Sequence, residues 1–327
     1  MSPLLRSPVD GVGVDLCYPL LLNTSCSRTL RSRSQATLLY ILLFSLSLLT
    51  VLLNLLVIIS ISHYRQLHTP TNLVLLSLAC SDLLIGLIVI PFHSLYFITS
   101  CWLLGQFMCP MIFALSLVLT SASVGSILLI SVDRYVAICQ PLRYNSEVTM
   151  LRVQLAVCLC WACAILYNCG LLWETLREPG RHTSCHGDCR VEMGMVSGAV
   201  DMLVTFLGPV FVVVVLYLRV FAAVLAQVRQ MRSSRVAGMA ARRSELKAAG
   251  TLGVVVVVFL ACFCPYFYPS FAGQDMSEVA PGSWLLYSNS CLNPLMYASF
   301  YPWFRKAIKL IVTLQILQPD SCQTTIF

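Results

Sequence analysis

Seven long apolar runs constrain this chain more than any other feature of its sequence. They lie at about 36–62, 72–99, 108–138, 153–172, 196–224, 248–271 and 284–300. Each run can cross the hydrocarbon core of a bilayer as a tilted helix, because about 20 apolar residues suffice for one crossing. The sequence therefore predicts an all-α membrane protein, a seven-transmembrane helix bundle.

The composition excludes other classes of protein. Hydrophobic residues make up 58% of the 327 residues and charged residues only 11%. Soluble domains carry about 25% charged residues, so an ordinary cytosolic enzyme is excluded, and the apolar content excludes a disordered chain. We expect an outer tail at 1–35, one transmembrane domain at 36–311 and an inner tail at 312–327.

Basic residues gather on one side of the predicted bundle, so the formal charge of +7 does not indicate nucleic acid as a partner. The inner helix ends, the inner loops and the C-terminus hold fourteen of them: Arg65, Arg134, Arg143, Arg152, Arg219, Arg229, Arg232, Arg235, Arg242, Arg243, Lys247, Arg305, Lys306 and Lys309. Segments rich in Lys and Arg stay in the cytoplasm. The pattern predicts a multi-pass plasma-membrane protein whose N-terminus is extracellular.

Residues 301–311 predict a contact with membrane lipid. Apolar positions in this segment alternate with Arg305, Lys306 and Lys309. Such a segment favours an amphipathic helix that lies on the inner leaflet.

Six cysteines fall on the oxidising outer side: Cys17, Cys26, Cys101, Cys109, Cys185 and Cys189. An even number outside favours three disulfides, although the count alone leaves their connectivity open. Metal binding by the cluster that ends at Cys189 is the weaker alternative. Asn23 begins an Asn-Thr-Ser glycosylation sequence on the outer tail.

Two acids, Asp82 and Asp201, lie within apolar runs and have no basic residue at matching depth. An ionisable group in the membrane is costly and usually functional. Asp201 lies about five residues inside the outer end of its run, roughly 7–8 Å deep, with Thr205 on the same face. It suits the ammonium group of a small amine. The alternative is an aspartate bonded to hydroxyl groups of a neighbouring helix.

Aromatic residues near the outer halves of the last two runs could surround such a cation: Phe263, Tyr266, Phe267, Trp284 and Tyr287. Each ring contributes about 0.5–2 kcal/mol to holding a cation where water is excluded. The alternative is that these rings only pack or anchor the helices at the interface.

Asp82 lies mid-span, with Ser123, Asn289 and Ser290 available as oxygen ligands. The cluster could hold a sodium ion, contain a protonated acid, or form a hydrogen-bonded core without an ion, and the sequence leaves these three open. No other cofactor is expected.

Short motifs in order along the chain carry a family resemblance. They are Asn54, the Leu-Ala-Cys-Ser-Asp string ending at Asp82, Asp133-Arg134-Tyr135, Trp161, Pro209, Tyr217, the Cys-Phe-Cys-Pro string at 262–265, and the Asn-Pro-Leu-Met-Tyr string that runs from Asn293 and Pro294 to Tyr297. Together they resemble a rhodopsin-like G-protein-coupled receptor. The strings at 60–72, 289–297 and 300–306 and the Cys-Tyr and Asn-Thr-Ser-Cys strings of the outer tail are similar to trace amine-associated receptors.

The resemblance implies a disulfide pattern. By similarity Cys109 pairs with Cys189, tying the third crossing to the second outer loop. Cys17 pairs with Cys185 and Cys26 with Cys101, which fastens the tail over the pocket.

The resemblance also identifies a departure at the ligand site. Eighteen residues before Arg134, where receptors of this kind usually carry an amine-binding aspartate, stands Ser116. Eight residues before Pro209 stands Asp201, the position to which fish branches of the family move the acid. The ligand amine is then expected to point toward the fifth crossing, with Ser116, Thr120 and Thr205 in the pocket. A diamine would need a second acid, such as Asp188 or Glu192.

Two further departures concern signalling. Phe263 replaces the tryptophan of most relatives, and Leu53 replaces a glycine. The resemblance implies a switch formed by Asp133, Arg134, Tyr135, Tyr217, Glu245, Asn293, Pro294 and Tyr297, in which Arg134 pairs with Asp133 and with Glu245 in the inactive state. It further implies a heterotrimeric G protein of the stimulatory class, a rise in cyclic AMP and an olfactory role.

The sequence disfavours three other functions: an opsin, a transporter and a membrane enzyme. An opsin needs a lysine in the seventh run, which has none. A transporter would show duplicated halves, and a membrane enzyme would need companions for His93, His182 or His186 that the sequence lacks. A receptor for a non-amine odorant stays open, because Ser116 replaces the usual acid.

Overall fold

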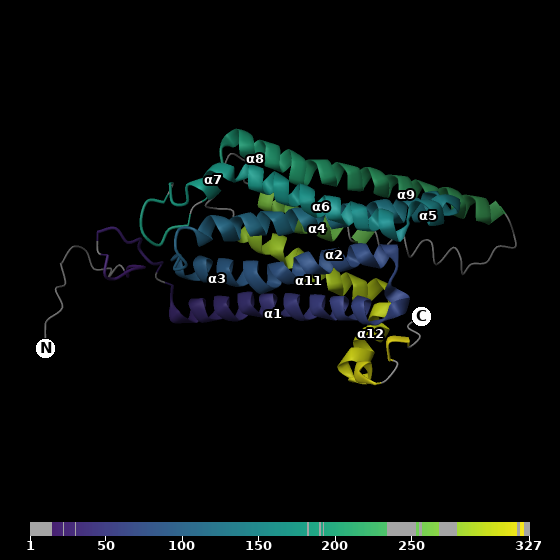
Figure 1. Ribbon diagram of the computed structural model, residues 1–327, viewed down its shortest axis with the longest axis horizontal. Helices are drawn as coiled ribbons and strands as arrows, with labels where there is room; N and C mark the ends of the chain where they lie inside the picture. The colour runs from purple at the N-terminus through teal and green to yellow at the C-terminus, as the bar shows by residue number, and fades with distance from the viewer. Residues whose placement is uncertain are drawn as a thin grey trace.

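Long helical segments run side by side along the long axis of the molecule (Figure 1). The computed structural model describes residues 15–21, 23–29, 31–181, 183–189, 191, 193–233, 253–254, 257–267, 280–318 and 321–323. Within these residues the segments are α1 (Arg33–His63), α2 (Pro70–Leu84) with η2 (Ile85–Val89) and α3 (Ile90–Thr99), α4 (Met108–Cys139), α6 (Met150–Leu171), α8 (Met195–Asp201) with η3 (Met202–Leu207) and α9 (Gly208–Ser233), Val257–Phe267, and α11 (Ala280–Phe300). The seven-helix bundle is confirmed.

Short helices connect these segments or follow them. They are η1 (Arg65–Leu67), α5 (Pro141–Glu147), α7 (Trp173–Arg177), α12 (Pro302–Val312), η5 (Gln315–Leu317) and η6 (Ser321–Gln323). In α12, Trp303, Phe304 and Ala307 are buried while Arg305, Lys306 and Lys309 are exposed. The amphipathic helix expected at this place is therefore present, and it leaves the bundle at the end opposite to the outer tail (Figure 1).

Capping residues explain why the first helices begin earlier than the apolar runs suggest. The side chain of Ser32 accepts a hydrogen bond from the Gln35 backbone, and the Gln35 side chain accepts one from the Ser32 backbone. Thr69 accepts from the backbone of Asn72, and Pro70 occupies the first helical turn. These are reciprocal capping and N-terminal proline features, so the polar residues before each apolar run belong to the helix start.

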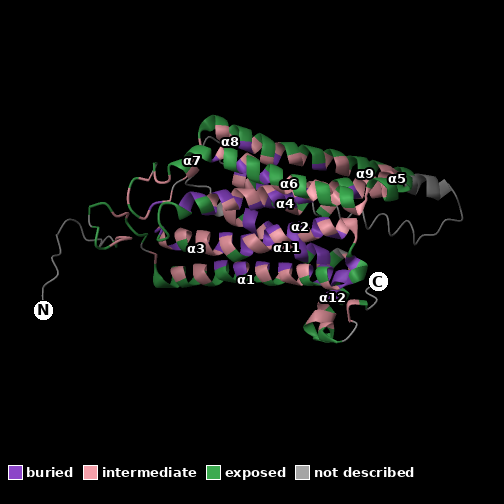
Figure 2. Ribbon diagram, in the orientation of Figure 1, coloured by how far each residue is buried: buried purple, intermediate pink, exposed green. Residues whose placement is uncertain are grey.

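The outer surface of the bundle is apolar and the polar residues lie inside. Five described helices are long and apolar enough to cross a membrane, and Val257–Phe267 is a shorter apolar helix. On α6, Leu151, Leu155, Leu159 and Leu166 are exposed, whereas α2 and α4 form the centre (Figure 2). An exposed apolar belt around a core containing Asn54, Asp82 and Asn293 is the arrangement that a lipid solvent requires.

Two π-helical segments interrupt the second and fifth crossings. Both end just before a proline, η2 before Pro91 and η3 before Pro209. A proline has no N–H to donate to the carbonyl one turn earlier, so the helix widens locally at that point. The second of these segments follows Asp201 directly and contains Thr205, and such widened turns are frequent at functional sites.

The disulfide pairing differs from the expectation at two of the three bonds. Cys109 pairs with Cys189 as expected, but Cys17 pairs with Cys101 and Cys26 pairs with Cys185. The expected pairs Cys17–Cys185 and Cys26–Cys101 are wrong.

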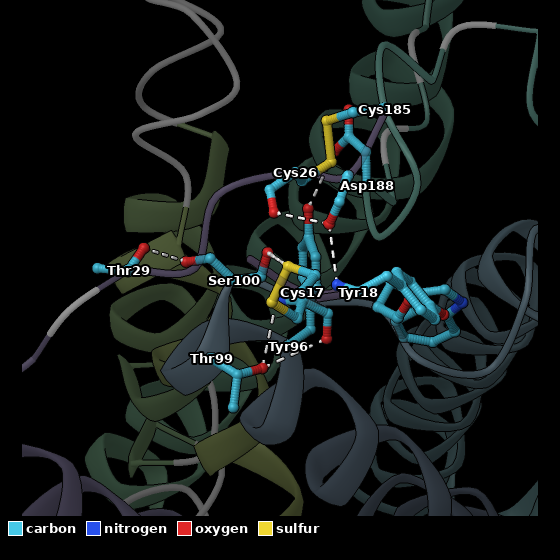
Figure 3. Close-up of a disulfide and its surroundings, with 12 residues drawn as sticks. Cys17, Tyr18, Cys26, Thr29, Tyr96, Thr99, Ser100, Cys185 and Asp188 are labelled. Carbon is cyan, nitrogen blue, oxygen red and sulfur yellow. Dashed lines mark hydrogen bonds between the residues drawn. A yellow bond between two sulfur atoms is a disulfide. The ribbon is translucent and has the colours of Figure 1, made fainter. Parts of the chain in front are cut away.

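The backbone of the tail explains this exchange. Cys17 and Cys26 lie side by side, because the Cys17 N–H donates to the Cys26 carbonyl at 2.9 Å. Their sulfurs bond to different cysteines, Cys101 and Cys185. The Cys26 N–H donates to the His186 carbonyl at 2.9 Å, and the His186 N–H donates to Thr24 at 2.7 Å. This short ladder sets Cys26 beside Cys185 and leaves Cys17 over the outer end of α3 (Figure 3).

Candidate functional site

An internal cavity of about 60 Å³ lies between the outer halves of five crossings. It is lined by His93, Phe113, Ser116, Leu117, Thr120, Ser121, Val124, Asp201, Thr205, Phe263, Tyr266, Phe267, Ser283, Leu286 and Tyr287. Eight of the nine residues expected at the ligand site are in this group, and Trp284 is not. About 10–15 Å³ holds one water molecule, so the cavity in this arrangement admits a ligand of only a few non-hydrogen atoms.

Asp201 supplies the only carboxylate among the described residues that line the cavity. It ends α8 and is 5% exposed. The Tyr167 hydroxyl on α6 donates to it at 3.4 Å, a long bond, and the Thr205 hydroxyl donates to its backbone carbonyl at 2.7 Å. None of the ion pairs formed within the described part of the chain involves Asp201.

Three polar side chains from three helices form a hydrogen-bonded chain in the wall of the cavity. The Tyr287 hydroxyl lies 3.1 Å from Ser116 Oγ and 3.2 Å from His93 Nδ1. The imidazole and the phenol also contact edge to face, with ring centroids 5.5 Å apart. From the sequence, His93 was considered only as a catalytic group, and its place in the cavity was missed. The position of His93 within the second apolar run could have indicated this, because a histidine buried there needs a hydrogen-bond partner.

Aromatic rings close the cavity on the side of Val257–Phe267. Phe267 stacks on Phe206 with centroids 4.6 Å apart and meets Tyr266 edge to face at 5.0 Å. Phe263, in the place of the usual tryptophan, packs against Phe259 with ring centroids 4.2 Å apart. Three of these rings, with Tyr287 from α11, form an aromatic part of the wall of the cavity that contains the Asp201 carboxylate.

Trp284 corrects one expectation, because it lies behind the cavity wall and does not line it. Its ring contacts Phe97 at 5.6 Å and Tyr287 at 5.9 Å. Three residues along a helix rotate a side chain by about 300°, so Trp284 is offset from Tyr287 toward α3. It supports Tyr287 from behind.

Asp188, considered as a second acid, is committed elsewhere. Ser184 donates to its carboxylate at 3.2 Å and Tyr96 of α3 donates at 3.4 Å, and Asp188 does not line the cavity. Glu192 lies outside the described residues. Asn23 is exposed in a turn of the outer tail, where its side chain is accessible.

Asp82 is fully buried at the centre of the bundle. Asn293 donates to one of its oxygens at 2.7 Å and Ser123 donates to the other at 3.3 Å. Asn289 was expected as a ligand here, but its amide oxygen has no hydrogen-bond partner among the described residues. The expectation missed Asn293, which lies one turn further along the same helix face.

The inner end of the bundle holds the Asp-Arg-Tyr motif in a closed arrangement. Arg134 forms an ion pair with Asp133, which also accepts hydrogen bonds from Thr71 and from Tyr144, each at 3.1 Å. Burial raises the pKa of Tyr144, so its hydroxyl remains a donor at neutral pH. The expected partner Glu245 lies outside the described residues.

The tyrosines of the expected switch belong to α4, α9 and α11. Tyr135 and Tyr217 pack against Val220 and Val224 of α9. Tyr297 is buried after Pro294 in α11 and contacts Phe304 of α12, with ring centroids 6.5 Å apart. Tyr135 and Tyr217 therefore connect the third and fifth crossings, and Tyr297 connects the seventh crossing to α12.

Comparison with known proteins identifies the class. Residues 53–297 match the family described as 7 transmembrane receptor (rhodopsin family). Trace amine-associated receptor 13c of Danio rerio is 37% identical, over 95% of this chain and 96% of its own length. Trace amine-associated receptor 1 of Mus musculus is 34% identical, over 95% and 99%. Trace amine-associated receptor 6 of Pan troglodytes is 36% identical, over 97% and 96%.

The chain belongs to the rhodopsin family of seven-transmembrane receptors and, within it, to the trace amine-associated receptors. It is therefore a multi-pass membrane receptor and not an enzyme. Its family implies two partners, a small ligand and a G protein. The resemblance drawn from the sequence motifs is confirmed.

Proposed function

We propose that this receptor detects small primary monoamines, whose ammonium group pairs with Asp201, and that it signals through a stimulatory G protein to raise cyclic AMP. We place it in the plasma membrane with its N-terminus outside, glycosylated at Asn23 and serving olfaction. The observation that carries the proposal is a carboxylate, 5% exposed, that lines an aromatic cavity and forms no ion pair among the described residues.

Electrostatics support the assignment. A carboxylate taken out of water loses solvation free energy, which an opposite charge within contact distance restores. A neutral Tyr167 hydroxyl at 3.4 Å offers only a small part of that compensation. An ammonium group supplies a full charge and three N–H donors, and the surrounding rings add cation–π attraction of about 0.5–2 kcal/mol each.

The size and charge of the cavity favour a monoamine. Asp201 is the sole acid among its described lining residues, and Ser116 stands where an amine-binding aspartate is usual. A second ammonium group in the same cavity would be desolvated without a countercharge.

Signalling follows from a shift between two helix arrangements. The amine must bind the active arrangement more tightly than the inactive one, because a ligand with equal affinity for both shifts nothing. In the arrangement described here Arg134 is held by Asp133. Release of Arg134 toward Tyr217 and Tyr297 would open the inner end to the G protein.

A neutral odorant is the second candidate, and the Tyr167 bond to Asp201 favours it. If that bond satisfies the acid, the cavity needs no cation. A separate proposal concerns Asp82, where a sodium ion would be held by the carboxylate, Ser123, Ser290 and the amide oxygen of Asn289, which has no hydrogen-bond partner among the described residues.

One experiment separates the two candidates. Cells that express the receptor and a cyclic AMP reporter are given a panel of primary, secondary and tertiary amines together with uncharged isosteres of each active compound. The proposal expects amines to act and their neutral isosteres to fail in the wild type, and expects Asp201→Ala to lose the response. Equal responses to an amine and its neutral isostere would favour the odorant alternative.

A further inference from the structure

The cavity has a second polar wall that the amine site leaves unused. Ser116 of α4, Tyr287 of α11 and His93 of α3 form a continuous chain of two hydrogen bonds, 3.1 and 3.2 Å long. All three residues line the cavity. Ser116 is 5% exposed and Tyr287 is 4% exposed, so their polar atoms are sheltered from bulk solvent.

This wall lies apart from Asp201. On α4 the cavity residue Ser121 accepts a hydrogen bond from Asn168 of α6 at 3.0 Å, and the neighbouring Tyr167 contacts Asp201. Ser116 instead faces α11 and α3. Five residues separate Ser116 from Ser121, which is about 7.5 Å along a helix and well over a quarter turn around it. The acid therefore belongs to the α6 side of the cavity and the trio to the opposite side.

The chemistry of the trio selects a neutral group. A phenol, a hydroxyl and an imidazole each donate and accept hydrogen bonds, and a hydroxyl oxygen can take part in three. Tyr287 uses two of these within the described part of the chain. A ligand hydroxyl, which also donates and accepts, can add to the chain in either direction. A second ammonium group would find no countercharge there, and a methyl group would gain no hydrogen bond.

We propose that His93, Tyr287 and Ser116 form a second ligand subsite for a neutral hydrogen-bonding group, so that the receptor prefers short amino alcohols over plain alkylamines and diamines. The inference rests on the proposed function, because Asp201 holds the ammonium end of the same ligand. It names the chemical class of the ligand: a primary amine whose far end, a few atoms away, carries a hydroxyl.

Three probes of equal length test this preference. They are 3-aminopropan-1-ol, n-butylamine and 1,3-diaminopropane, which differ only in the hydroxyl, methyl or amino group at the far end. Binding is measured as ligand-dependent thermal stabilisation of the full-length receptor in lipid nanodiscs, a readout that needs no G protein. We expect the amino alcohol to bind about 3- to 10-fold more tightly than butylamine, the range of one net hydrogen bond.

Variants locate the effect. Tyr287→Phe and His93→Phe keep a ring in place but should reduce the preference for the amino alcohol over butylamine to less than about twofold. The matched control is Ser94→Ala, which removes the hydroxyl beside His93 that donates to the Ile90 backbone carbonyl at 2.6 Å and does not line the cavity, and it should leave the preference intact. Asp201→Ala should weaken the amino alcohol and butylamine together.

The outcomes separate the two proposals. If both amines bind and depend on Asp201 but have equal affinity, the second subsite is overturned and the proposed function stands. A preference that survives in Tyr287→Phe and His93→Phe also overturns the subsite. If none of the three amines stabilises the receptor, the proposed function fails and the subsite fails with it.

Discussion

The outer and inner acids of this bundle are treated in opposite ways. At the inner end, Asp133 has a cation, Arg134, and two hydroxyl donors, all supplied by the chain. In the outer cavity, Asp201 has the Tyr167 hydroxyl at 3.4 Å and the nearby Thr205 hydroxyl, but no cation among the described residues. The inner carboxylate is thus paired internally and can act as a latch. Under the proposed function, the outer carboxylate is completed by a ligand from outside, and the receptor then has a sensing end at Asp201 and a signalling end at Asp133.

The largest expected effect is the loss of amine affinity when the outer acid, Asp201, is removed. Asp201→Ala should cost about 2–5 kcal/mol of amine binding free energy, the scale for removing one partner of a buried charge pair. Competition binding on membranes measures it. Asp188→Ala is the matched control, since that acid is held in the outer loop by Ser184 and Tyr96, and it should change amine affinity by less than about 0.5 kcal/mol. Unchanged amine affinity in Asp201→Ala would refute the proposal that Asp201 pairs with the ligand ammonium group.

At the inner end, removing the charge of Asp133 should change signalling without ligand. Asp133→Asn should weaken the hold on Arg134 by about 1.5–3 kcal/mol, the range for hydrogen bonds to charged groups, and so raise signalling without ligand. Basal cyclic AMP, normalised to receptor surface density, is the readout. Tyr144→Phe removes one neutral donor to the same acid and should have a smaller effect of the same sign. Basal signalling that does not rise in Asp133→Asn would show that this pair is not the latch.

Ser116→Asp sharpens the comparison by giving the cavity a second acid. The variant should gain affinity for a diamine by about tenfold, or about 1.4 kcal/mol, because a second ammonium group then finds a countercharge. Dose–response curves for a diamine and its matching monoamine measure the change. Ser116→Asn controls for size. An unchanged diamine affinity would mean that position 116 does not face the bound ligand.

The smallest expected effect concerns Tyr167. If Asp201 serves a ligand, Tyr167→Phe should change amine affinity by only about 0.5–1.5 kcal/mol and barely alter the melting temperature of the free receptor. If the Tyr167–Asp201 bond is structural, Tyr167→Phe and Asp201→Ala should lower that melting temperature alike. Thermal unfolding of the ligand-free variants distinguishes the two cases.

Much of the fold could be predicted because one physical rule dominates it. Every crossing needs a continuous apolar run, and five of the runs match the observed segments to within about four residues, while the fifth segment continues nine residues beyond its run, to Ser233. The helix starts at Ser32 and Thr69 were missed because capping residues are polar and fall outside an apolar run. The π-helical turns were missed because their cause, a proline in the next turn, was not weighed.

Some site residues could be predicted from their own stretch of sequence, and others depend on contacts with other helices. Asp201 could be found because a lone acid in an apolar run is costly. The involvement of His93, and the choice of Asn293 over Asn289 at Asp82, depend on which residues of other helices lie opposite, which one sequence does not state. The exchanged disulfides have the same origin, since the pairing depends on the ladder that binds Cys26 to His186.

The most direct test of a sensing end built around Asp201 is a density map of the receptor with an active amine bound. We expect the ligand nitrogen at about 2.7–2.9 Å from the Asp201 carboxylate, the distance of a charge-assisted hydrogen bond, with the ring of Phe267 or Tyr266 within about 6 Å of that nitrogen. A map in which Asp201 keeps Tyr167 as its only polar partner, while the nitrogen lies elsewhere, would contradict the account.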